Sequence, residues 1–101
     1  MSDEELIWPS TPEATILRLL AERGALYGLA LVKASGGKLK RAGIYVQLER
    51  LLRKGLVTAR DDESSDDYVG IARRLYEISE LGARALRARE AAHRAWEGGD
   101  A

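Results

Sequence analysis

One stretch of the chain, residues 38–56 with the sequence KLKRAGIYVQLERLLRKGL, constrains the fold more than any other. Its apolar residues Ile44, Leu48 and Leu51 recur at the spacing of one helix face, which predicts an amphipathic α-helix. The residues between them make a polar and mostly basic second face, formed by Gln47, Arg50, Arg53 and Lys54. The stretch therefore predicts a helix with one buried side and one cationic side.

The end of this helix is also encoded locally. Gly55 stands where a left-handed residue ends a helix, and Lys54 lies in the last turn, where the helix dipole favours a cation. The next residues, 56–58, begin a strand. A basic helix that runs directly into a strand is typical of a recognition helix followed by a wing.

The charges of the chain are unevenly distributed, although they sum to zero. Residues 14–57 carry nine Lys and Arg side chains against two Glu, whereas residues 1–13 carry four acidic side chains and no basic one. Residues 58–72 hold five acidic side chains against Arg60. Phosphate binding depends on a local basic patch rather than on net charge, so nucleic acid remains a predicted partner.

Two helices are predicted before the basic one, and the second of them is short. Ser10 and Glu13 have the spacing of a capping box, which predicts a first helix over about 11–23. A second helix is expected over about 28–35, and residues 38–41 form a basic loop. Three helices with short connections, the third of them basic, indicate a helix-turn-helix core.

A hairpin and a last helix complete the prediction. The hairpin runs out over about 56–60 and back over 73–78, with a polar, flexible tip at 61–72. Ser79 is expected to cap a helix over about 80–96. The predicted fold class is mainly α with a small β-hairpin (α+β), a winged helix-turn-helix with a C-terminal dimerisation helix. Its parts are an acidic arm at 1–9, a DNA-binding domain at 10–78 and the helix and tail at 79–101.

The last helix has a narrow apolar stripe, and little of a small domain remains to cover it. A second copy of the chain is the economical partner, which predicts a homodimer. The apolar residues 6–8 of the acidic N-terminal arm are expected to pack either on the core of their own chain or on the second subunit. The predicted interface residues are Leu6, Trp8, Leu81, Ala85, Ala88, Ala92 and Trp96.

Nothing in the chain predicts catalysis. There is no cysteine, the only histidine is His93, and no acid–base pair or activated nucleophile is recognisable. The segment DDESSDD lacks the spacing of a calcium loop, so no metal or cofactor is expected. No apolar run approaches the about 18 residues of a membrane span, and the acidic N-terminus does not resemble a signal peptide. The predicted location is the cytoplasm.

Three segments resemble the PadR family of transcriptional regulators. ILRLLAERGALYGLAL resembles the first two helices of that family, and IYVQLERLLRKGLV resembles its recognition helix with a hydrophobic-Tyr pair and a Gly-Leu-Val exit. GIARRLYEISELGARAL resembles the returning wing strand and the start of the C-terminal helix. Together these segments cover roughly residues 14–90 and resemble the branch of the family with a single C-terminal helix.

The resemblance implies a winged-helix homodimer that binds a palindromic operator, usually as a repressor. Some members of the family bind small planar or phenolic effectors in or near the dimer interface. Trp96, with Trp8 nearby, is the candidate for such a site, since two indoles in a dimer could enclose a planar molecule. The alternative is that Trp96 only caps the interface or covers the N-terminal arm.

The expected DNA contacts divide by chemistry. Gln47 suits the edge of adenine, and the missing side chain at Gly43 allows close approach. Tyr45 belongs either to the core or to a phosphate contact. The family's wing tip is basic, whereas this one is acidic, so any wing contact is expected at its base. Phosphate or base contacts are expected from Tyr27, Lys38, Lys40, Arg41, Arg50, Arg73 and Arg74. For Arg50 the alternative is an ion pair with a carboxylate of its own fold.

A second interpretation stays open. Zero net charge and the acidic wing tip are also compatible with a winged-helix protein–protein interaction module that does not bind DNA. The two interpretations differ in whether the basic helix face stays open or is blocked by residues 61–67.

Overall fold

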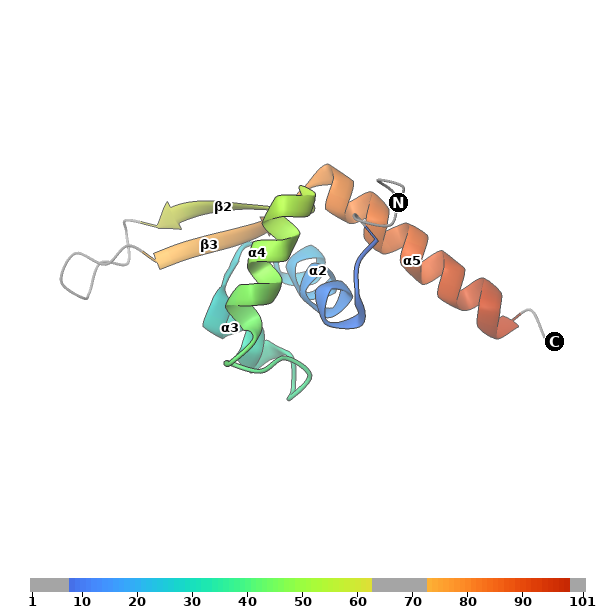
Figure 1. The fold of residues 1–101 in the computed structure, drawn as a ribbon, viewed down its shortest axis with the longest axis horizontal. Coiled ribbons are helices and arrows are strands. Elements are labelled where there is room, and N and C mark those ends of the chain that lie inside the picture. Colours follow the sequence, from blue (N-terminus) through green and yellow to red (C-terminus); the bar gives the residue numbers. More distant parts are fainter. Residues whose placement is uncertain (1–7, 63–72, 99–101) are drawn as a thin grey trace.

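The computed structural model describes residues 8–62 and 73–98 (Figure 1). Along the chain these residues form α2 (Thr11–Arg23), β1 (Leu26–Tyr27), α3 (Gly28–Ala34), α4 (Ile44–Lys54), β2 (Val57–Asp62), β3 (Arg73–Ile78) and α5 (Glu80–Gly98). Within this part of the chain, four helices and one antiparallel sheet confirm the predicted α+β winged-helix class. The β2–β3 hairpin projects from one side of the helical body, and α5 extends from the opposite side (Figure 1).

Helix α2 begins at the predicted capping box. The Ser10 side chain accepts a hydrogen bond from the Glu13 backbone N–H, and the Glu13 carboxylate accepts one from the Ser10 N–H at 2.9 Å. The helix then buries Ile16, Leu17 and Leu20 in the common core. The local signal and the apolar spacing therefore agree on where α2 begins and which side faces inward.

Helix α4 follows its sequence pattern closely. Ile44, Leu48 and Leu51 are fully buried. Gly55 ends the helix with φ +76°, and the N–H groups of Gly55 and Leu56 bond to carbonyls of the last turn. Because Gly55 adopts a left-handed conformation without strain, the chain turns directly into β2.

The sheet has one strand more than the sequence predicts, in the order β1-β3-β2. Leu26 and Tyr27 were expected only to lead into the second helix, yet they pair with Tyr76 and Leu75 of β3. Two residues are too few to show an alternation, so this strand has no signature of its own. It joins the start of α3 to the base of the wing.

The wing strand β2 is longer than expected, which corrects the predicted tip at 61–72. Asp61 and Asp62 lie in the strand and pair in register with Arg74 and Arg73 of β3. Opposite charges directly across an antiparallel pair stabilise the ladder, which the polarity of one strand alone does not reveal. The rest of the predicted tip, residues 63–72, lies outside the described residues.

Helix α5 begins at Ser79, as predicted. The Ser79 side chain accepts from the Gly82 N–H at 2.9 Å and donates to the Gly55 carbonyl at 2.7 Å. Its first turns pack on α2 and bury Leu86 in the core. None of the helices described here is long and apolar enough to span a membrane.

Candidate nucleic-acid interface

Helix α4 presents one continuous outer face. The residues opposite its buried side are Tyr45, Val46, Glu49, Arg50 and Arg53, and all of them are exposed. Tyr45 is 53% exposed, so its core alternative is wrong. Its ring instead lies against Gly28, where an added Cβ would come within 2.8 Å of the Tyr45 ring. The outer face therefore has an aromatic and aliphatic end near its N-terminus and a charged end near its C-terminus.

Gln47 lies at the border of this face rather than at its centre. The residue is half-buried, and its side-chain oxygen is buried without a hydrogen-bond partner among the described residues. Its amide nitrogen lies beside Gly43, 3.7 Å from where a Cβ on that glycine would stand. Gly43 itself has φ −110°, so its backbone conformation does not require glycine.

The basic loop before α4 is anchored by a residue that the sequence analysis missed. Leu39 is 2% exposed, and its N–H donates to the Ser35 side chain at 2.9 Å. Because Leu39 points into the core, its neighbours Lys38 and Lys40 are exposed, as is Arg41. The position of Leu39 between two lysines could have predicted that this apolar side chain is buried and holds the loop in place.

The predicted residues Tyr27, Arg73 and Arg74 lie together where the hairpin passes beside β1, a part of the wing that we call the wing base, and each has a partner within the chain. The Arg73 guanidinium lies over the Tyr27 ring, 4.9 Å from its centroid. The Tyr27 hydroxyl hydrogen-bonds to the Asp62 carboxylate. Arg74 lies 3.9 Å from a carboxylate oxygen of Asp61. Carboxylates of β2 therefore occupy groups that were expected to meet phosphate.

A cavity of about 700 Å³ connects α4 to the wing base. It is formed by the start of α3, one flank of α4 and strand β3, and it brings together residues from segments far apart in the sequence. Its lining includes Tyr27, Leu29, Lys33, Tyr45, Glu49, Arg73 and Arg74. The lining holds three cations and one carboxylate, and this positive balance is suited to anionic groups.

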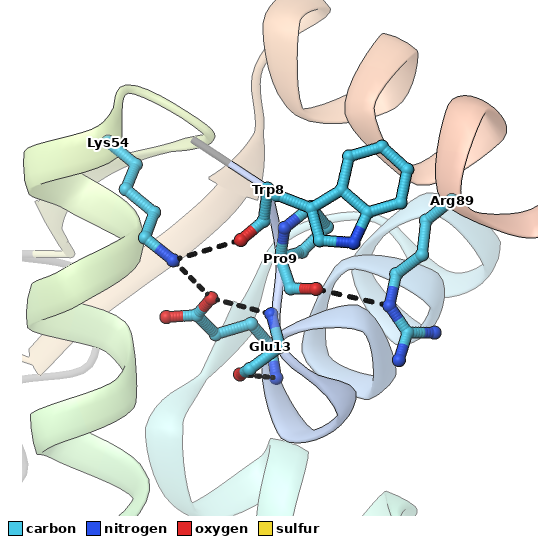
Figure 2. A network of polar contacts seen from close by, with 6 residues as sticks. Trp8, Pro9, Glu13, Lys54 and Arg89 are labelled. Atoms are coloured by element: carbon cyan, nitrogen blue, oxygen red, sulfur yellow. Dashed lines mark hydrogen bonds and ion pairs between the residues drawn. The ribbon is translucent and has the colours of Figure 1, made fainter. Parts of the chain in front are cut away.

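Lys54 is not part of the open basic face, which corrects the sequence interpretation. Its ammonium group lies 2.6 Å from the Glu13 carboxylate and 3.3 Å from the Trp8 carbonyl oxygen (Figure 2). The Glu13 side chain is 1% exposed and that of Lys54 is 22% exposed. A buried carboxylate needs an ion partner, so Lys54 serves the fold rather than the surface.

Replacing Lys54 by methionine is expected to lower the free energy of unfolding by about 2 kcal/mol, because Glu13 would remain buried without its cation. Urea unfolding measures the difference. Arg53→Met removes the same charge from an exposed neighbour and should change stability little. Equal unfolding midpoints for the two variants would contradict the structural role of the ion pair.

Two arginines tie the other segments to this body. Arg89 of α5 donates to the Pro9 carbonyl at 3.1 Å (Figure 2) and to the Thr11 hydroxyl at 2.9 Å. Arg18 of α2 forms an ion pair with Glu90 of α5 at 3.1 Å. Residues 8–11 are therefore held between the end of α4 and the middle of α5.

The predicted dimer residues separate into two groups. Leu81 and Ala85 pack against the core of the same chain, so this part of the stripe is already covered. Further along α5, Ala88, Ala92 and Trp96 are exposed, with Trp96 84% exposed. Trp8 is 47% exposed, and Leu6 lies outside the described residues. The stripe left for a partner thus begins about two turns into α5.

No group of three His, Cys, Asp or Glu side chains within residues 8–62 and 73–98 is arranged to hold a metal ion. Apart from Glu49, the exposed groups on the outer face of α4 and on loop 38–41 are cationic, aromatic and aliphatic, as in surfaces that bind nucleic acid.

Residues 16–88 match the family model described as "Transcriptional regulator PadR-like family". The chain belongs to the PadR-like family. Its members are regulators of transcription. No curated protein sequence matches this PadR-like chain.

Solved structures share the fold. A PadR family regulator from Clostridium difficile R20291 superposes with a TM-score of 0.74 at 21% identity, covering 88% of this chain and 93% of that one. Bacillus subtilis PadR, solved in complex with operator DNA, has a TM-score of 0.68 at 21% identity over 78% of this chain and 47% of its own. PcaV from Streptomyces coelicolor, solved with its natural ligand, has a TM-score of 0.71 at 22% identity, over 93% and 64%.

Proposed function

We propose that this PadR-like regulator binds a palindromic operator as a homodimer and acts as a repressor. The observation that carries the proposal is that the exposed basic loop 38–41 leads directly into α4, whose outer face borders a cavity shared with the wing base. Bacillus subtilis PadR was solved with operator DNA, and the shared fold supports the same mode of binding here. Binding of operator DNA would place the protein in the cytoplasm.

Each interface group has a proposed role. Lys38, Lys40 and Arg41 bind phosphates, because they are exposed cations just before the recognition helix. Arg50 binds phosphate from the helix. Gln47 reads a base edge once its amide turns outward from the position in which its oxygen is buried, and Gly43 permits the close approach. Groups bordering the cavity contact the backbone on the wing side, namely Tyr27, Tyr45, Arg73 and Arg74.

Dimerisation is proposed through α5, which keeps the division into an arm at 1–9, a DNA-binding domain at 10–78 and a C-terminal helix at 79–101. Ala88, Ala92 and Trp96 are exposed on a helix that extends away from the body (Figure 1). A second copy would bury this stripe, together with Trp8 and Leu6. A planar effector between the exposed Trp96 and Trp8 indoles would then act at this interface.

The test is selection of duplexes from a random pool at low salt, followed by sequencing. The proposal expects a palindrome whose half-sites are about one helical turn apart. It also expects binding that weakens steeply with salt and a solution mass of two chains. A monomeric protein that selects no duplex would contradict it.

The second candidate, a protein–protein interaction module, is favoured by one observation. Asp61 and Asp62 already pair with groups at the wing base, so part of the expected phosphate site is occupied by the chain's own carboxylates. The outer face of α4 and loop 38–41 nevertheless stay exposed, which favours DNA.

Asp61→Asn is expected to tighten DNA binding by about three- to tenfold at low salt, because it releases Arg74 and removes a charge that repels phosphate. Titration of a labelled duplex measures the change. Glu97→Gln makes the same change of charge on the outer half of α5, away from the wing, and should leave affinity unchanged. A gain of equal size in both variants would show only a general charge effect.

A further inference from the structure

Exposed large apolar side chains are few in the described part of the chain, and one of them has no role in packing. Trp8 and Trp96 belong to the arm and α5, while Leu29, Tyr45 and Val46 lie on α3 and the start of α4. Leu29 and Tyr45 line the cavity beside α4, but Val46 does not. Val46 is 55% exposed and stands on the outer face of α4.

The residues one helical turn before and one turn after Val46 differ in charge. Ala42, four residues before it, is exposed and uncharged, and Arg50, four residues after it, is exposed and cationic. Lys40 and Arg41 precede this uncharged patch. The outer face therefore has an apolar centre with cations on both sides, and Glu49 beside Arg50 is its one carboxylate.

Helix stability does not explain valine at this position. A β-branched side chain loses rotamer freedom in a helix, and an exposed site gains little from burial. Lysine, glutamate or alanine would favour the helix more. An exposed valine on the outer face is instead suited to an apolar group that approaches from outside.

We propose that Val46 contacts the 5-methyl group of a thymine in the major groove and so sets a preference for thymine at one position of each half-site. The inference rests on the proposed DNA-binding function. Among the groups that base pairs present in the major groove, the thymine methyl is the apolar one. Cations before and after Val46 would hold the flanking phosphates, which places the centre of the face over base edges.

The test uses a duplex selected by the protein, in which each thymine is replaced singly by deoxyuridine. This change removes only the methyl group and keeps every hydrogen-bonding group. At one position per half-site, wild-type protein is expected to lose about fourfold in affinity, the value of one methyl group removed from an apolar contact. Val46→Ala should reduce that loss to less than about 1.5-fold at the same position.

Leu29→Ala is the matched control, since Leu29 is an exposed aliphatic residue on α3 that is 46% exposed. It should keep the fourfold loss. Equal losses in wild type and Val46→Ala, or no thymine position that responds in a duplex that binds tightly, would overturn the inference while leaving the proposed function intact. Failure to bind any duplex would overturn the proposed function, and this inference with it.

Discussion

Gly82→Ala is expected to destabilise the protein by about 3 kcal/mol or more, which is a large part of the total stability of a small domain. A Cβ at Gly82 would lie 2.0 Å from the Leu56 carbonyl oxygen and 2.9 Å from the Ile78 side chain. The first of these atoms belongs to the backbone and cannot rotate away. Helix α5 would have to move off the junction between α4 and β2, breaking the contacts of Ser79 with Gly55.

Thermal unfolding followed by circular dichroism measures this effect, and the midpoint should fall by more than about 10 °C. Gly43→Ala is the control, because a Cβ there meets only the Gln47 side chain at 3.7 Å, an ordinary contact. It should shift the midpoint by only a few degrees. A Gly82→Ala protein as stable as Gly43→Ala would mean that α5 does not pack as closely as described.

The combined variant Lys40→Ala and Arg41→Ala is expected to weaken duplex binding by about 10- to 100-fold at low salt. Both side chains are exposed on a loop that Leu39 holds in place, so their loss removes charge without removing structure. Because phosphate contacts carry no sequence information, all duplexes should weaken to a similar degree. The slope of log affinity against log salt should fall by about two.

The control for this variant removes two charges elsewhere. Arg87 and Arg94 are exposed on α5, and replacing both with alanine should leave the affinity and the salt slope nearly unchanged. If that control weakened binding as much, the effect would reflect net charge rather than the loop. A loss confined to particular sequences would instead assign base contacts to Lys40 or Arg41.

The occupied state of the wing base has a consequence for affinity. In the free chain the Tyr27 hydroxyl donates to Asp62, and Arg74 pairs with Asp61. When DNA binds, Tyr27 and Arg74 must exchange these carboxylates for phosphates. Exchange of one anion for another gains less than the filling of a free site. The loop 38–41 and the outer face of α4 are therefore expected to provide most of the affinity, and the wing a smaller part.

Features that depend on neighbouring residues follow from the amino-acid sequence alone. The capping box at Ser10, the left-handed stop at Gly55 and the cap at Ser79 are local hydrogen-bond patterns. The spacing of Ile44, Leu48 and Leu51 was sufficient for the buried side of α4. The same spacing places Val46 opposite the core, although the sequence analysis gave it no role.

Features that depend on distant partners become visible once the chain is folded. Lys54 lies on the flank of α4, and only the position of Glu13 shows that it points inward. Strand β1 forms because its two residues pair with the free edge of β3. Asp61 and Asp62 extend β2 because arginines of β3 lie opposite them. Leu81 and Ala85 belong to the core because α5 packs back on the body. These are contacts between segments far apart in the chain, and no short stretch contains both partners.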